Sequence, residues 1–298
     1  MTQDLMGSMP TKEVGSSVAV SKQIDQEIKK EKLAGRNVVK MLLLGPSNSG
    51  KSTVLKQMKI LHLNGFTETE LRECRDLIHK NLLNSAYALI RAMEMYQTQF
   101  KNSARQADAQ LLVDTVEKNC YNSNTITKEL SEAIARLWAD PALKQCYQKG
   151  KDVHIPVSTE YFLNSLERIC AYEYVPTEQD ILFTRVATLG VAEIRFELKG
   201  IKFIVIDVGG QRTERKKWIH HFENVNSVLF TAAISEYDIN MAEDNNTNRI
   251  VDALQLFQNI TESRWFRKTS MILFLNKTDI FRQKIRSVPI TVAFPDYT

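Results

Sequence analysis

Short, nearly continuous apolar runs mark the strands that the sequence predicts. Residues 38–44 form the first run, which ends at Gly45, and such a run is typical of a strand buried on both faces of a parallel sheet. Two similar runs follow much later, at 228–230 and 271–275. Residues 192–206 contain an alternating segment, a Lys-Gly turn and a further apolar run, which together predict a β-hairpin.

Helical periodicity occurs between these predicted strands. Val54, Met58 and Leu61 recur at the spacing of one helix face directly after the first strand. Residues 66–181 contain one glycine, Gly150, and their apolar positions recur near every 3.6 residues, which predicts an all-helical unit. Strand signals precede and follow this unit, so we expect one domain to be inserted into another.

Strands that alternate with helices predict a three-layer α/β domain on either side of the helical unit. Ser21 is a candidate cap of a short terminal helix with Ile24 and Ile28 on one face, and this helix is either solvated or bound to a partner. The expected parts are a disordered segment with this helix at 1–36, the first part of the α/β domain at 37–65, the helical insertion at 66–181 and the second part of the α/β domain at 182–298.

The composition narrows the classes of function. The net charge of +4 over 298 residues is far from the concentrated basic surface that nucleic-acid binding requires, so we expect no nucleic-acid partner. The four cysteines lack C-x-x-C spacing and the five histidines lack paired metal-ligand spacing, which disfavours metal binding through these side chains. No apolar run approaches the roughly 20 residues of a membrane-spanning helix, so we expect any membrane contact to be peripheral.

Residues 45–52 follow the pattern G-x-x-x-x-G-K-S between a predicted strand and a predicted helix. In such a loop, successive backbone N–H groups surround phosphates, Lys51 supplies a positive charge and the hydroxyl of Ser52 is a ligand for Mg²⁺. The alternative is a glycine-rich turn without a ligand. The order of strand, loop and helix favours a phosphate-binding loop.

Two further motifs also follow predicted strands. Asp207 opens the sequence D-V-G-G-Q, and a carboxylate at the carboxyl end of a strand can hold the hydration shell of Mg²⁺. Asn276, Lys277, Thr278 and Asp279 form the sequence N-K-T-D. An aspartate accepts from both the ring N–H and the exocyclic amine of guanine, which adenine does not offer, so this motif predicts GTP rather than ATP. Taken singly, each motif is also compatible with a surface turn.

Together with the segment 180–188, the three motifs resemble the heterotrimeric G-protein α subunits. The similarity covers most of the chain and is most specific at 50–60 and 207–220. It implies a Ras-like P-loop GTPase domain with an inserted all-helical domain, and GTP or GDP bound between them with Mg²⁺. It also implies a G-protein βγ dimer, a G-protein-coupled receptor and a downstream effector as partners. The expected location is cytoplasmic, at the cytoplasmic face of the plasma membrane when βγ is bound.

The resemblance assigns roles to individual residues. Arg185 and Gln211 are the expected catalytic residues, the first as an arginine finger supplied in cis and the second as the group that orients the attacking water. Ser52 and Thr188 are the expected protein ligands of Mg²⁺, joined through water by Asp207. The expected phosphate contacts are Asn48, Ser49, Gly50, Lys51, Ser52, Thr53 and Gly210, and the expected guanine contacts are Asn276, Lys277 and Asp279. The switch segments are expected to contact the nucleotide through Leu182, Phe183, Thr184, Arg185, Asp207, Val208 and Gly209, and the helical side through Ser158. The expected contacts with βγ are Lys216, Lys217 and an exposed Trp218.

The phosphate loop departs from the family pattern at Pro46, Ser47 and Asn48, where members usually carry Ala or Thr, Gly and Glu. A side chain at Ser47 can crowd Gln211 or the attacking water, where glycine leaves room. Asn48 lacks the negative charge that, in relatives, helps to hold Arg185 in place. We therefore expect slow hydrolysis.

Both ends of the chain also depart from the pattern. The chain does not begin Met-Gly, and Met6-Gly7 fits the N-myristoylation motif only if translation starts at Met6. After Asp279 the family pattern includes one more strand, a guanine-contacting loop and a final helix, so we expect a truncation at Thr298. Three interpretations remain open. They are a working GTPase switch, a cycling-defective module that binds βγ or effectors, and an ATP-using P-loop enzyme, which the N-K-T-D motif and Gln211 oppose.

Overall fold

The computed structural model describes residues 37–118, 126–149, 155–186, 188, 190–241, 243–244 and 246–297. The predicted terminal helix at Ser21 and the candidate start at Met6 lie outside the described residues. Among the described residues, no helix is both long and apolar enough to cross a membrane.

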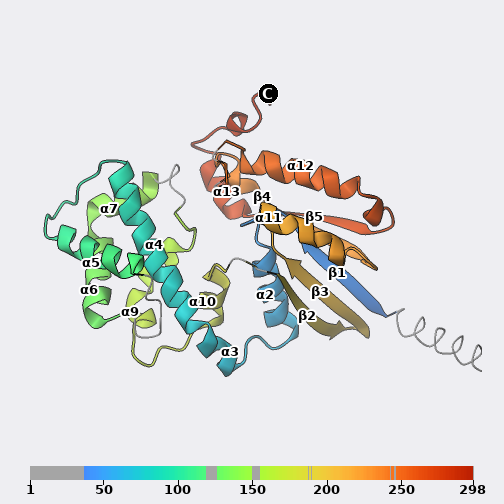
Figure 1. The fold of residues 1–298 in the computed structure, drawn as a ribbon, viewed down its shortest axis with the longest axis horizontal. Helices are drawn as coiled ribbons and strands as arrows, with labels where there is room; N and C mark the ends of the chain where they lie inside the picture. The colour runs from blue at the N-terminus through green and yellow to red at the C-terminus, as the bar shows by residue number, and fades with distance from the viewer. Residues whose placement is uncertain are drawn as a thin grey trace, which may run out of the picture.

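A five-stranded sheet forms the core of the α/β part, with the order β2-β3-β1-β4-β5 (Figure 1). β2 runs antiparallel to β3, and the other neighbours are parallel. This arrangement confirms the predicted α/β fold class. The strands are β1 (Val38–Leu44), β2 (Val191–Leu198), β3 (Ile201–Val208), β4 (Ser227–Ala233) and β5 (Ser270–Asn276).

The predicted hairpin joins β2 to β3 with a two-residue turn. Lys199 and Gly200 both have positive φ angles, 52° and 76°, as a tight hairpin turn with the twist of the strands requires. The pairing runs in register from Val191 opposite Val208 to Leu198 opposite Ile201. The hairpin prediction is therefore confirmed, and the turn sets the position of the segment after β3.

Helices cover both faces of this sheet. On one face, Phe257 of α12 lies against Phe230 of β4, with ring centroids 5.1 Å apart. On the other face, Leu55 of α2 packs in a cluster with Leu43 and Leu229. The helices of this part are α2 (Lys51–His62), α11 (Arg212–Arg215), α12 (Arg249–Thr261) and α13 (Thr278–Lys284), with 3₁₀ helices η1 (Lys216–His221), η2 (Ile234–Glu236), η3 (Arg264–Phe266) and η4 (Ile290–Val292).

A second group of helices lies beside the sheet and has its own apolar core (Figure 1). Ile78, Leu82 and Leu89 of α4, the longest helix in the described part of the chain, are fully buried in this core. Across 68–118, 126–149 and 155–183, the described residues of this stretch form helices and no strand, as predicted, although its exact limits at 66 and 181 stay a prediction. The helices are α3 (Glu68–Glu73), α4 (Arg75–Met95), α5 (Arg105–Glu117), α6 (Lys128–Ala139), α7 (Pro141–Lys149), α8 (Thr159–Asn164), α9 (Leu166–Ile169) and α10 (Glu178–Phe183).

Asp180 holds the start of α10 to this group of helices. Its buried carboxylate accepts from the two terminal guanidinium nitrogens of Arg168 at 2.7 and 2.8 Å, and from the hydroxyls of Tyr161 and Tyr174 at 2.7 and 2.9 Å. It also accepts from the backbone N–H of Thr177 at the helix start. Burial raises the pKa of Asp180, but the hydrogen bonds, first that from Arg168, outweigh it and hold the pKa well below its ordinary value. α10 therefore leaves the helical core in a fixed direction.

The burial expected for the last strand is wrong. The apolar run at residues 271–275 predicts a buried strand, but Ile272, Leu273, Phe274 and Leu275 are 42% to 53% exposed. β5 is the edge of the sheet, next to β4 alone, so its other side and much of both its faces lack cover from described residues. An apolar run shows that a strand can be buried, whereas its place in the sheet decides whether it is.

Candidate functional site

The three sequence motifs meet at one edge of the sheet. The phosphate loop follows β1, the D-V-G-G-Q sequence follows from the end of β3 and the N-K-T-D sequence begins at the end of β5. These strands are parallel, so their carboxyl ends point the same way, and in α/β sheets ligands bind at that end. The candidate site is built here.

Glycine and asparagine give the phosphate loop its turn. Gly45, Asn48 and Gly50 have positive φ angles of 141°, 62° and 104°. A β-carbon at Gly45 would lie 2.3 Å from the carbonyl oxygen of Thr231, so no larger residue fits there. The hydroxyl of Ser49 lies 2.6 Å from that of Thr231, which joins the loop to β4. Local sequence and one contact from a distant strand together set the loop shape.

Lys51 lies inside the loop. Its Nζ donates to the carbonyl oxygens of Gly45 at 3.0 Å and Pro46 at 2.8 Å, and the residue is buried. Burial lowers the pKa of Lys51 to about 8, in part offset by Asp207. The ammonium group is thus held among backbone dipoles at the position where a phosphate loop needs positive charge.

Three oxygen-bearing side chains from distant parts of the chain converge beside Lys51. The Ser52 hydroxyl donates to Oδ2 of Asp207 at 2.5 Å and lies 2.8 Å from the Thr188 hydroxyl, which is 3.3 Å from the same carboxylate oxygen. Oδ1 of Asp207 is buried and has no hydrogen-bond partner among the described residues. Burial raises the pKa of Asp207, against the hydrogen bond from Ser52. Hard oxygen ligands and an unsatisfied carboxylate oxygen fit a Mg²⁺ ion.

The N-K-T-D motif contacts the phosphate loop directly. The Asn276 side chain donates to the carbonyl oxygen of Ser49 at 2.8 Å, and the Lys277 ammonium lies 2.7 Å from the carboxylate of Glu236. Asp279 is exposed in the first turn of α13. The structure therefore places a candidate base site next to the candidate phosphate site.

A cavity of about 360 Å³ lies beside the phosphate loop. Ser47, Asn48, Arg185 and Gln211 all line it. Their convergence matters because they come from three separate segments, the loop after β1, the segment after α10 and the start of α11. The two predicted catalytic residues thus line one space together with Ser47 and Asn48, two of the three unusual loop residues.

Gly210 allows the segment after β3 to approach the loop closely. A β-carbon there would lie 2.4 Å from Nζ of Lys51 and 2.7 Å from the carbonyl oxygen of Pro46. Its own carbonyl oxygen accepts from Nε of Arg215 at 3.3 Å. Glycine is therefore required for Gln211, the next residue, to reach the cavity.

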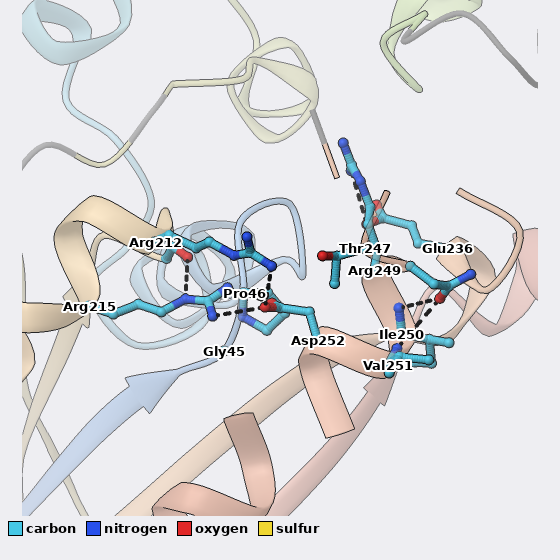
Figure 2. Close-up of polar contacts among 12 residues, drawn as sticks. Gly45, Pro46, Arg212, Arg215, Glu236, Thr247, Arg249, Ile250, Val251 and Asp252 are labelled. Carbon is cyan, nitrogen blue, oxygen red and sulfur yellow. Dashed lines mark hydrogen bonds and ion pairs between the residues drawn. The ribbon is translucent and has the colours of Figure 1, made fainter. Parts of the chain in front are cut away.

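Ion pairs connect parts of the chain that line this cavity (Figure 2). Arg215 lies 2.6 Å from a carboxylate oxygen of Asp252, and Arg212 lies 3.4 Å from the other. Arg249, at the start of α12, lies 3.1 Å from Glu236. Because Asp252 and Glu236 are largely buried, the pairs of Asp252 hold α11 to α12, and the pair of Glu236 holds η2 to the start of α12.

Trp218 does not have the exposed position expected of a βγ contact. It is 2% exposed, and its indole N–H donates to the carbonyl oxygen of Gly209 at 2.7 Å. The indole fills the apolar core under the sheet, and this burial outweighs the polar character of its neighbours in sequence. Lys216 and Lys217 are exposed, and Lys217 pairs with Glu214.

The segment before Arg185 faces the helices more than the cavity. Phe183 stacks on Tyr161 with ring centroids 4.1 Å apart, and Thr184 is buried with its hydroxyl donating to the Asp180 carbonyl oxygen at 2.6 Å. Leu182 is half-buried. These side chains position the segment, and any nucleotide contact from it stays a prediction.

The remaining predicted residues have mixed positions. Val208 is buried in the core, while Gly209 packs so closely on Thr188 that a β-carbon would lie 2.6 Å from its carbonyl oxygen. Thr53 is exposed on α2. Ser158 is buried at the start of α8 and is not part of the cavity wall, so its nucleotide contact stays a prediction.

Sequence reasoning missed Thr231, Glu236, Arg249 and Asp252, which all shape the site. They lie in β4, in η2 and in α12. None belongs to a spaced motif, and an isolated acidic or basic residue in a polar segment resembles a solvated surface residue. Only the fold shows their contacts.

The family model described as G-protein alpha subunit matches residues 18–298. The guanine nucleotide-binding protein alpha-7 subunit of Caenorhabditis briggsae is 45% identical over 292 residues, and the alpha-17 subunit of Caenorhabditis elegans is 46% identical over 293 residues. The G(o) subunit alpha of Locusta migratoria is 43% identical over 292 residues. Each match covers 98% of this chain and 82% of the relative.

Proposed function

Because this chain belongs to the G-protein alpha subunit family, we propose that it is a GTP-hydrolysing signalling switch whose phosphate loop makes hydrolysis slow. Members of the family are GTPases that transduce signals, and this chain matches them over nearly its whole length. A single observation supports the slow rate. Ser47 and Asn48 line the same cavity as Arg185 and Gln211. The matches favour this function over a non-cycling binding module.

We assign the nucleotide to the edge of the sheet where the three motifs meet. Lys51 and the backbone N–H groups of the phosphate loop are suited to phosphate, since the ammonium already lies within the loop. Asn276 and Asp279 are suited to the guanine base through the amide and carboxylate groups that guanine can pair with. Lys277 supports this site through its pair with Glu236.

Ser52, Thr188 and Asp207 are the residues that would hold Mg²⁺. Their oxygens converge, and the free Oδ1 of Asp207 is suited to a metal-bound water. When bound, the ion neutralises charge on the phosphates during transfer to water. Thr188 belongs to the segment after Arg185, so the ion would also connect that segment to the phosphate loop.

Gln211 and Arg185 perform the proposed hydrolytic roles. The side-chain amide of Gln211 orients a water molecule for attack on the terminal phosphate. The guanidinium of Arg185 stabilises the negative charge that grows on the phosphate oxygens in the transition state. Neither residue needs to exchange a proton with the phosphate for these roles.

The loop residues reduce this catalysis in two ways. The Ser47 side chain occupies space in the cavity where Gln211 and its water must fit. Asn48 offers an amide where a carboxylate would attract the Arg185 guanidinium, so the arginine is held less firmly. Both effects lower the rate without removing a phosphate contact.

We propose the partners of this chain from its membership of the family. Lys216, Lys217 and the exposed side of η1 are the candidate contacts for a G-protein βγ dimer, while buried Trp218 supports this surface from beneath. A receptor and a downstream effector complete the proposed signalling cycle. The proposed location is the cytoplasmic face of the plasma membrane, reached by peripheral association.

Single-turnover hydrolysis of radiolabelled GTP tests this function. We expect Arg185→Ala to lower the rate by about 10³-fold, because the finger arginine contributes roughly 10³ to 10⁵ in rate in such enzymes and Asn48 attracts its guanidinium less than a carboxylate would. We expect Gln211→Leu to lower it as well, and ATP to be neither bound nor hydrolysed. Equal rates for both variants and the wild-type protein would contradict the assigned roles.

A further inference from the structure

The backbone of Arg185 is held by a side chain from the helical group. Oδ1 of Asn81 accepts from the Arg185 N–H at 2.9 Å, and Nδ2 of Asn81 donates to the Arg185 carbonyl oxygen at 3.1 Å. The two hydrogen bonds form a reciprocal pair, so they fix both the place and the orientation of one residue. That residue carries the proposed catalytic guanidinium.

Asn81 is itself well anchored. It belongs to α4, where its neighbours Ile78 and Leu82 are fully buried in the helical core. Its Nδ2 also donates to the carbonyl oxygen of Leu77 at 2.8 Å, one turn earlier in the same helix. The side chain therefore needs a donor and an acceptor on one short stem, which an amide has and a carboxylate or an alkyl group lacks.

A second anchor holds the residues just before Arg185. Nζ of Lys56, on α2, donates to the carbonyl oxygens of Ile181 at 2.8 Å and Thr184 at 2.9 Å. These carbonyls lie at the carboxyl end of α10, where a cation is favourable. α2 follows the phosphate loop directly, so the segment before Arg185 is tied to the loop helix while Arg185 itself is tied to α4.

We propose that Asn81 is a positioning residue for Arg185, through which the helical group sets the rate of GTP hydrolysis. The inference rests on the proposed role of Arg185. Asn81 acts on the main chain of Arg185 and does not line the cavity. Small displacements of a catalytic group lower the rate greatly. The two hydrogen bonds from Asn81 limit how far the Arg185 backbone moves from the cavity.

The test compares Asn81→Ala with wild-type protein in single-turnover GTP hydrolysis and in binding of a fluorescent GTP analogue. We expect hydrolysis to slow by about tenfold, since a displacement on the order of 1 Å can cost up to about 10²-fold. Binding should change by less than about twofold because Asn81 does not reach the phosphate loop. Arg91→Ala, an exposed change further along α4, is the matched control and should leave both values unaltered.

A double-mutant comparison separates positioning from general damage to the fold. In an Arg185→Ala background, adding Asn81→Ala should slow hydrolysis no further, because the group that Asn81 positions is gone. An equal slowing in both backgrounds, or no slowing in the wild-type background, would overturn the inference. Asn81→Asp keeps the acceptor and nearly the same volume, so it should show the same pattern even if the alanine variant folds poorly.

The outcome also distinguishes this inference from the proposed function. If Arg185→Ala alone leaves the rate unchanged, the role of Arg185 fails and the inference fails with it. If Arg185→Ala slows hydrolysis and Asn81→Ala does not, only the positioning role fails.

Discussion

At the scale of residues, the unusual phosphate loop has a conformational reason for one of its departures. Asn48 has a φ of 62°, in the left-handed region that asparagine enters more readily than other non-glycine residues. The local sequence thus suits the backbone of the loop, although the side chain is poorly suited to attract Arg185. At this position, asparagine favours the stability of the loop, whereas a carboxylate would favour the rate of hydrolysis.

The left-handed backbone conformation of Asn48 predicts that substitutions at this position change the free energy of unfolding. We expect Asn48→Glu to lower the free energy of unfolding by about 1 kcal/mol, since glutamate enters the left-handed region at greater cost. Asn48→Gly, which takes positive φ freely, should not lower it. Urea denaturation followed by circular dichroism measures both, and a glutamate variant as stable as the wild-type protein would contradict the conformational argument.

Much of the site could be predicted at this scale, because the phosphate loop and the N-K-T-D motif are contiguous stretches with fixed spacing. Ser52, Thr188 and Asp207 were also expected together, and the structure brings them together. Asn81 could not be predicted, since nothing near it in sequence points to Arg185, 104 residues away. The basic neighbours of Trp218 predict an exposed side chain, which is wrong, because its ring is buried in the core.

At the scale of elements, α10 links the helical core to Arg185, the proposed catalytic arginine. Its amino-terminal end is fixed by the Asp180 cluster, and its carboxyl-terminal end by Lys56. The helix is only six residues long, so its own hydrogen bonds contribute little and these anchors hold it. Strands and long helices were predictable from periodicity, but this short helix depends on contacts from elsewhere.

The Asp180 cluster predicts a measurable loss of stability. We expect Asp180→Asn to lower the free energy of unfolding by about 2 to 3 kcal/mol at pH 7, near the low end for broken buried ion pairs because Arg168 is partly exposed. The folded-state pKa of Asp180 lies below its unfolded value. Its contribution is therefore complete above about pH 4 and is lost as the pH falls further.

Chemical denaturation at pH 7 and at pH 3 checks both parts of this prediction. The difference between the wild-type protein and Asp180→Asn should narrow at the lower pH. Glu167→Gln, an exposed change on the neighbouring helix α9, should have little effect at either pH. A difference that stays constant from pH 7 to pH 3 would show that the charge of Asp180 is not responsible.

At the scale of the whole molecule, the helical group and the α/β part meet around Arg185. Arg185 lies between α4 of the helical group and the cavity beside the phosphate loop. The fold class was predictable because strand and helix periods differ clearly along the chain. The exposure of β5 was not, since strand order is a property of the complete sheet and a single apolar run carries no information about its neighbours.

The central claim is that this G-protein α subunit hydrolyses GTP slowly because of Ser47 and Asn48. Single-turnover hydrolysis by Ser47→Gly combined with Asn48→Glu, against the wild-type protein, tests it most directly. We predict that the double variant is at least about tenfold faster, a barrier lower by about 1.4 kcal/mol, with binding of a GTP analogue unaltered. An unchanged rate in a folded double variant that still binds the analogue would contradict the claim.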